Sequence, residues 1–247
     1  HRPDAPMTYA AMPGLAQPVA RLVMGCDNQA TMPHAAAVWD DYVERGGNTF
    51  DTAYVYYNGL QEQLLGQWIR NRGIRGQVVV IGKGAHTPFC TPEGLTEHLL
   101  VSLDRLQTDH VDIYLMHRDN LDVPVGEFVD VLNEHVAAGR IRTFGGSNWS
   151  IARLKAANRY AARHAKQGFQ VLSNNFSLAR MVAPPWAGCE SARDAASRKW
   201  LRQSQTPLLA WSSQARGFFT DRAGRDRLDD GELVRCWYAD DNFARRE

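Results

Sequence analysis

The chain has 247 residues, of which 44% are hydrophobic, and its formal net charge is only +1 at pH 7. A chain of this size and composition can bury a large core, in one large domain or two smaller ones. The balanced charge argues against a nucleic acid or an anionic membrane as partner, and no apolar run approaches the roughly 20 residues that span a bilayer.

Cysteine usage bears on the compartment. The four cysteines lie far apart and form no C-x-x-C pair. This pattern favours reduced thiols over a disulfide framework or a zinc knuckle. Because the charged start HRPDAP does not resemble a signal peptide either, we expect a cytoplasmic protein. The histidines show no ligand spacing, so no metal site is expected.

Strand-like and helix-like segments alternate after a proline-containing lead-in over residues 1–19, which we expect to form a hairpin. Short β-branched runs predict strands at 20–25, 48–53, 77–84, 111–117, 141–148, 170–175 and 207–213. Helical spacing predicts helices at 34–46, 60–73, 93–106, 125–140, 151–165 and, more weakly, 194–205. Helix-end signals are Thr91, Pro92 and Ser150 at starts, and Gly46, Gly73 and Gly139 at ends.

This alternation, with strands that are apolar almost throughout, indicates an α/β fold whose parallel sheet is covered by helices. Two architectures fit, a doubly wound sheet and a closed (β/α)₈ TIM barrel. A dinucleotide-binding doubly wound fold would carry G-x-G-x-x-G after its first strand. Here that strand ends in MGCDNQ, and the nearest match, GKGAHT, lacks the third glycine. We therefore expect residues 20–247 to form the barrel.

In such a barrel the active site gathers where the strands end. The predicted strand ends carry polar and ionisable residues of different types: Asp51 with Tyr56 after it, Lys83, His117, Ser147 and Asn148. A buried Lys83 needs an acid beside it, and Asp51 is the acid on the neighbouring strand. A cation near Tyr56 should lower its pKa from about 10, which would make it a proton donor and acceptor. His117 could then orient the proton on a substrate oxygen.

Two segments resemble motifs of the aldo-keto reductases, namely DTAYVYYNGLQEQLLG at 51–66 and GRIRTFGGSN at 139–148. The resemblance runs from about residue 9 to about residue 220. It implies a tetrad of Asp51, Tyr56, Lys83 and His117, with Tyr56 as general acid for carbonyl reduction. It also implies a nicotinamide cofactor, NADP(H) rather than NAD(H), bound without a Rossmann fold.

The same resemblance implies further cofactor contacts. Ser147 and Asn148 would hold the carboxamide, and Asp51 would lie beside the cofactor. Trp211 would stack on the nicotinamide ring, while Ser212 and Gln214 fall in the pyrophosphate-binding loop. Ser173, with Asn174 next to it, stands where the family has a glutamine, so that contact departs from the pattern.

The resemblance also implies an eighth strand, closing helices and a basic segment for the 2′-phosphate of NADP. Because the sequence ends at Glu247, we expect the barrel to lack its C-terminal strand and helices here, and the chain to be a piece of a longer or fused protein. The predicted substrate is a polar, sugar-like aldehyde or ketone, near Arg118, Asp119 and Asn120. The predicted aromatic walls are Phe89, Trp149 and Phe176. The alternative is a nicotinamide-binding regulatory or scaffold subunit with little turnover.

Overall fold

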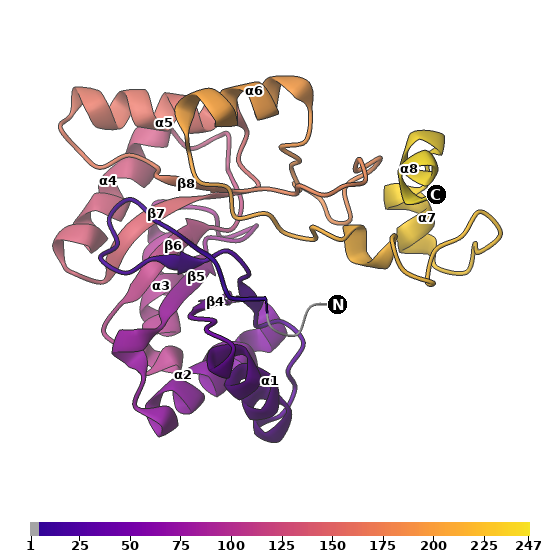
Figure 1. The fold of residues 1–247 in the computed structure, drawn as a ribbon. Helices are drawn as coiled ribbons and strands as arrows, with labels where there is room; N and C mark the ends of the chain where they lie inside the picture. Colours follow the sequence, from indigo (N-terminus) through magenta and orange to yellow (C-terminus); the bar gives the residue numbers. More distant parts are fainter. Residues whose placement is uncertain (1–4) are drawn as a thin grey trace.

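The computed structural model describes residues 5–247, and a six-stranded parallel sheet lies at its centre (Figure 1). The strands follow one another in chain order, β3-β4-β5-β6-β7-β8, without the reversal of a doubly wound sheet. Their bounds are β3 (Met24–Gly25), β4 (Thr49–Asp51), β5 (Val79–Gly84), β6 (Val111–Met116), β7 (Ile141–Ser147) and β8 (Val171–Ser173). The arrangement is the wall of an α/β barrel, as the sequence predicted for these strands.

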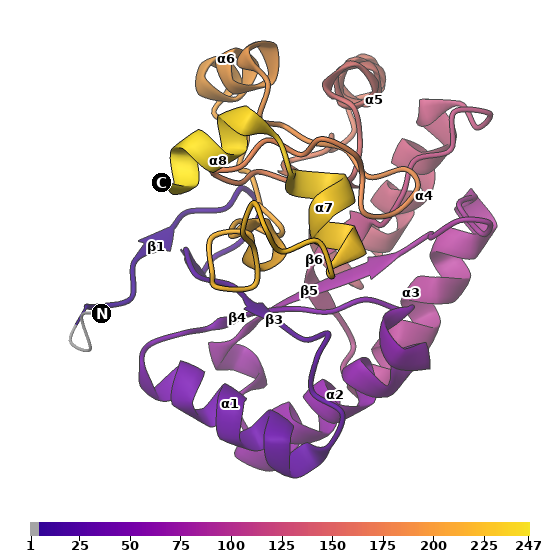
Figure 2. The same ribbon diagram turned by 90° about the vertical axis from the view of Figure 1, so that its right-hand side faces the viewer.

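Six helices follow the chain between and after these strands and lie along the outer side of the sheet (Figures 1 and 2). They are α1 (Met32–Glu44), α2 (Leu60–Arg72), α3 (Pro92–Leu106), α4 (Val125–Ala137), α5 (Ile151–Arg163) and α6 (Ala195–Ser204). Two predicted caps are confirmed: Thr91 Oγ1 accepts a hydrogen bond from the Gly94 amide at 3.1 Å, and Ser150 Oγ accepts one from the Arg153 amide at 3.1 Å.

The outer core is rich in aromatic side chains. Trp39 of α1, Phe50 of β4 and Trp68 of α2 pack together, with ring centroids 5.2 to 6.2 Å apart. The helices themselves pack closely, since a Cβ atom at Gly66 of α2 would meet the carbonyl oxygen of Leu106 at 2.3 Å. Glycine is therefore required where α2 meets the end of α3.

A hairpin of β1 (Tyr9–Ala10) and β2 (Val19–Ala20) precedes the sheet. Val19, with Met12 from the turn, joins the apolar cluster on the inner face of the sheet. The strand predicted over 20–25 is wrong in this respect, because its first residue belongs to the hairpin and only Met24–Gly25 pair with β4. Side chains cause the split: Asn48 Oδ1 and Thr49 Oγ1 each accept a hydrogen bond from the Ala20 amide at 3.0 Å.

The strand predicted over 207–213 is not formed as a strand. This segment meets β8 and its extension only through isolated bridges, from Leu172 to Leu208 and from Asn175 to Trp211. Ser212 adopts a left-handed backbone (φ 48°), which ends the extended run early. Residues 5–247 thus supply six strands and one bridge-paired segment of a barrel wall.

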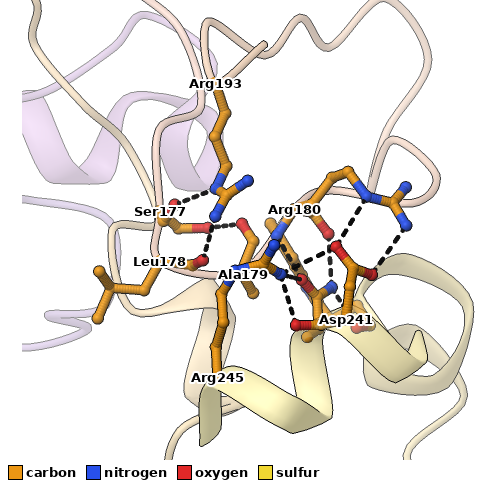
Figure 3. A network of polar contacts seen from close by, with 9 residues as sticks. Ser177, Leu178, Ala179, Arg180, Arg193, Asp241 and Arg245 are labelled. Carbon is orange, nitrogen blue, oxygen red and sulfur yellow. Dashed lines mark hydrogen bonds and ion pairs between the residues drawn. The ribbon is translucent and has the colours of Figure 1, made fainter. Parts of the chain in front are cut away.

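Two short helices that the sequence did not predict, α7 (Gly231–Trp237) and α8 (Asp240–Arg246), follow this segment. Figures 1 and 2 place them beyond the carboxyl ends of the strands. They form a separate small core around Phe218, Leu233, Trp237 and Phe243. An ion pair ties α8 to the loop after β8, because Asp241 accepts a hydrogen bond from Arg180 at 3.0 Å; within α8, Asp241 also accepts one from Arg245 at 2.9 Å (Figure 3).

The loop end of this network is held by backbone contacts. Arg193 Nε donates to the Ser177 carbonyl at 2.9 Å, and its Nη2 donates to the Leu178 carbonyl at 2.7 Å (Figure 3).

None of the helices within residues 5–247 is both long enough and apolar enough to cross a membrane.

Candidate active site

The ionisable residues predicted at the strand ends share the inner face of the sheet. Along a strand, alternate residues face the same side, so Lys83 faces the way Val79 and Ile81 do, into the inner apolar cluster. His117 likewise continues the inward series of Ile113 and Leu115.

Backbone hydrogen bonds continue past the strand ends and hold these residues in line. The Thr52 amide donates to the Ile81 carbonyl at 2.9 Å, and the Tyr54 amide to the Lys83 carbonyl at 2.8 Å. The His117 amide donates to the Gly84 carbonyl at 2.7 Å. The sheet therefore delivers three of the four predicted catalytic side chains, and Tyr56 follows in a short 3₁₀ turn.

Lys83 is almost completely buried and forms an ion pair with Asp51. Its Nζ also donates to the Thr52 carbonyl at 2.8 Å. Burial alone would lower the pKa of Lys83, but the interactions with the Asp51 carboxylate and the Tyr56 phenol outweigh it and raise the pKa to about 12. Lys83 therefore keeps its charge at any physiological pH.

Tyr56 lies beside this cation, with Lys83 Nζ 5.0 Å from its ring centroid. Burial raises the pKa of Tyr56 above its ordinary value, and the positive charge of Lys83 lowers it by less than burial raises it. The prediction that the pKa of Tyr56 is lowered is therefore wrong, because the sequence does not show that the phenol is buried. Tyr56 is protonated at neutral pH, as a proton donor must be.

His117 is uncharged at neutral pH. Burial, followed by the charges of Lys83 and Arg118, lowers its pKa well below the ordinary value. Its ring meets Tyr56 edge to face at 5.9 Å and His86 at 4.9 Å between centroids. Its buried Nδ1 has no hydrogen-bond partner among the residues that the structure describes.

A buried ion pair between Arg105 and Glu62 holds the segment that leads to Tyr56. Arg105 Nη1 donates to Glu62 Oε2 at 3.1 Å and to the Tyr54 carbonyl at 2.9 Å. Tyr54 stacks on His98 with 3.8 Å between ring centroids. Tyr54 is therefore a packing residue of this turn.

The predicted cofactor residues lie at the ends of β7 and β8. Asn148 adopts a left-handed backbone (φ 58°), and its amide donates to the Ser173 carbonyl at 3.0 Å. Asn148 Nδ2 donates to Ser147 Oγ at 3.2 Å, and Asn148 Oδ1 accepts from the Glu190 amide at 3.2 Å. This places Ser147, Asn148 and Ser173 side by side.

Asn174 points elsewhere, since its Nδ2 donates to the Trp149 carbonyl at 2.9 Å. The backbone carbonyl of Trp211 accepts a hydrogen bond from Asn175 Nδ2 at 3.2 Å. Ser212 and Gln214 follow Trp211 in the chain. Apart from Asn174, every predicted catalytic and cofactor residue lines one cleft of about 1910 Å³, which extends from the β1–β2 hairpin to the carboxyl ends of the strands.

Several residues that line this cleft were not singled out for it from the sequence. His86 follows β5, and Trp186, Cys189 and Glu190 come from the long loop after β8. Trp186 lies 6.5 Å from Trp211 between ring centroids. That loop has no strand or helix periodicity, so only the tryptophan itself could have served as a signal.

The predicted aromatic walls are not those of the cleft. Trp149 is fully buried against Phe128 and Phe169, and its Nε1 donates to the Arg118 carbonyl at 3.1 Å. The left-handed turn at Asn148 directs it into the core. Phe89 and Phe176 do not line the cleft either, nor does Asn120, whose Nδ2 donates to the Cys90 carbonyl at 3.1 Å.

Arg118 and Asp119 do line the cleft, as predicted, together with the four ionisable residues at the strand ends. The arrangement combines a protonated phenol, a fixed ammonium and a neutral imidazole around one space. Such a set can protonate an oxygen and stabilise the charge that develops on it.

A sequence model described as the Aldo/keto reductase family matches residues 22–232. The chain belongs to this family. It is 28% identical over 228 residues to aldo-keto reductase ausK of Aspergillus calidoustus, covering 86% of this chain and 55% of that protein.

Two further similarities bear on function. A probable voltage-gated potassium channel subunit beta of Oryza sativa subsp. japonica is 33% identical over 143 residues, which cover 55% of this chain and 44% of that protein. The crystal structure of an aldo-keto reductase from Klebsiella pneumoniae in complex with NADPH superimposes with a TM-score of 0.69 at 25% identity, covering 87% of this chain and 72% of that one. The chain thus spans about half the length of these curated relatives.

Proposed function

We propose that this protein reduces an aldehyde or ketone to an alcohol with NADPH, and that Tyr56 donates the proton. The observation that carries the proposal is the cluster of Tyr56, Lys83, Asp51 and His117 in one cleft of an aldo/keto reductase chain. These residue types, brought together from separate strands, form an acid–base site rather than a packing cluster.

The cofactor site is assigned to the other side of the same cleft. When bound, NADPH supplies the hydride for the carbonyl carbon. Ser147 and Ser173 offer hydroxyl groups for its carboxamide, and Trp211 offers an aromatic face for its ring. The indole Nε1 of Trp211 is buried without a partner among residues 5–247, which suits a ligand with an acceptor. We propose NADP(H) rather than NAD(H) as the cofactor because the Klebsiella pneumoniae relative was solved in complex with NADPH.

Each catalytic side chain then has a defined task. Tyr56 is protonated at neutral pH and gives its proton to the carbonyl oxygen. Lys83 stays charged and stabilises the phenolate that results. Asp51 keeps Lys83 in place, and the neutral imidazole of His117 hydrogen-bonds the substrate oxygen.

Turnover by the full-length wild-type protein tests this proposal. Oxidation of NADPH is followed at 340 nm with aldoses, ketoses and aromatic aldehydes, and kcat/KM is compared across them and between NADPH and NADH. We expect turnover with several carbonyl compounds and a higher kcat/KM with NADPH. Tight NADPH binding without turnover on any of them would contradict the proposal. A cytoplasmic location and a further fused domain stay predictions.

A regulatory subunit is the second candidate, because relatives from Oryza sativa subsp. japonica and Arabidopsis thaliana are named as probable potassium channel beta subunits. In that case the cofactor site would report the redox state to a partner. The same assay separates the two, since a regulatory subunit would bind NADPH and turn over slowly or not at all.

A further inference from the structure

Arg118 is a charged residue of the cleft to which the proposed chemistry gives no role. It follows His117 directly, at the carboxyl end of β6. Its residue exposure is only 7%, yet it lines the cleft. A guanidinium group is always charged in proteins, so a nearly buried arginine needs partners for its charge and for its five N–H groups.

Neither partner of Arg118 in the structure carries a charge. Nη1 donates to the carbonyl of His117 at 2.8 Å, and Nη2 contacts the Cys189 thiol at 3.8 Å. Within residues 5–247 no ion pair involves Arg118. The neighbouring carboxylate of Asp119 is taken by Arg153 at 3.0 Å. A buried charge without a counterion is costly, unlike the paired Lys83 in the same cleft.

The other acids of the cleft do not neutralise it. Asp51 is engaged by Lys83, and Asp27 follows β3, three strands from β6 in the sheet. Glu190 comes from the same loop as Cys189 but forms no ion pair within the described residues, and burial raises the pKa of its carboxyl group. Arg118 is therefore the cleft's uncompensated buried cation.

We propose that Arg118 binds a carboxylate of the substrate, so that the preferred substrates are aldehydes or ketones that carry an acid group. This rests on the proposed carbonyl reduction and names its substrate class. The planar fork of arginine matches a carboxylate with two parallel hydrogen bonds. Because Arg118 is the residue next to His117, it would hold the acid group at the same end of the cleft as the reacting carbonyl.

The test compares two probes that differ in charge and little in shape, 4-formylbenzoate and 4-formylbenzamide, with the full-length protein and NADPH. The wild type should favour the benzoate in kcat/KM. Arg118→Met should lower kcat/KM for the benzoate by about 10- to 100-fold, mainly through KM, and leave the benzamide unchanged. Arg118→Lys should recover part of the loss. Arg163→Met, at an exposed arginine of α5 that does not line the cleft, is the matched control and should keep the preference.

A binding measurement separates this inference from the proposed function. Terephthalate cannot be reduced at a carbonyl but carries the same acid group, and its binding to the NADPH-loaded protein is followed by calorimetry. Equal use of both aldehydes by the wild type, or an equal loss on both in Arg118→Met, would overturn the inference and leave the reductase standing. Terephthalate binding that requires Arg118, without reduction of either aldehyde, would refute the reductase and keep the acid site. Neither binding nor turnover would refute both.

Discussion

Replacement of Lys83 by methionine shortens the side chain by only one atom and removes the charge beside Tyr56. Lys83 Nζ lies 5.0 Å from the centroid of the Tyr56 ring. If this separation is taken as the distance between the Lys83 charge and the phenolate charge, their Coulomb attraction is about 3 kcal/mol at an effective dielectric constant of about 20. Because about 1.4 kcal/mol corresponds to one pH unit, the loss of Lys83 should raise the pH midpoint at which Tyr56 ionises by about 2 units.

The assay is alcohol oxidation with NADP⁺, because that direction requires the phenolate of Tyr56 and its rate rises with pH. In Lys83→Met the rising limb should move to higher pH by about 2 units, and the reaction at neutral pH should slow. Lys155→Met, at a cation that lies over Trp200 on the outer helices, is the matched control and should leave the profile in place. A folded Lys83→Met protein with the wild-type profile would refute the reasoning and leave Lys83 a structural residue.

The remaining predictions concern stability and pH. Gly66→Ala should lower the free energy of unfolding by about 1–3 kcal/mol in urea titrations, because the new Cβ would meet the Leu106 carbonyl oxygen at 2.3 Å. A Cβ at Gly76 would meet nothing within 4 Å, so Gly76→Ala should not lower the free energy of unfolding in this way. Equal losses in Gly66→Ala and Gly76→Ala would contradict the close packing of α2 on α3. Asp51→Asn leaves Lys83 buried without its ion-pair partner and should lower the free energy of unfolding by about 3 kcal/mol. The double variant Asp51→Asn with Lys83→Met should recover part of that loss. A single variant as stable as the wild type would show that the ion pair is not needed for stability. Because burial keeps His117 neutral, wild-type reduction should show no acid limb between about pH 6 and 8, and a limb that disappears in His117→Gln would show that the imidazole titrates there.

The sequence could predict the positions at the strand ends because they depend on local pattern. The period of two along β5 places Lys83 on the same face as Val79 and Ile81, and parallel neighbours bring Asp51 and His117 to the same edge. These placements need only the strand assignment. The catalytic and cofactor roles of the residues stay predictions until they are measured.

What the sequence could not predict depends on contacts between distant segments. The direction of the Tyr56 pKa follows from burial, which no local pattern reveals. Trp149 enters the core because Asn148 turns the chain in a left-handed conformation. The contribution of Trp186 to the cleft depends on how a long loop without periodicity folds back over the strand ends. The helices α7 and α8 are too short for their periodicity to stand out.

The central claim is that Tyr56 gives the proton in an NADPH-dependent carbonyl reduction. The direct measurement is kcat for an aldehyde that the wild type reduces, in Tyr56→Phe and in Tyr54→Phe, with NADPH affinity determined for both. Tyr54 is in the same turn but stacks on His98 outside the cleft, so its hydroxyl should be dispensable. Tyr56→Phe should lose about 10²- to 10⁴-fold in kcat with NADPH affinity retained, while Tyr54→Phe stays near the wild type. Near-normal kcat in a folded Tyr56→Phe protein would contradict the account.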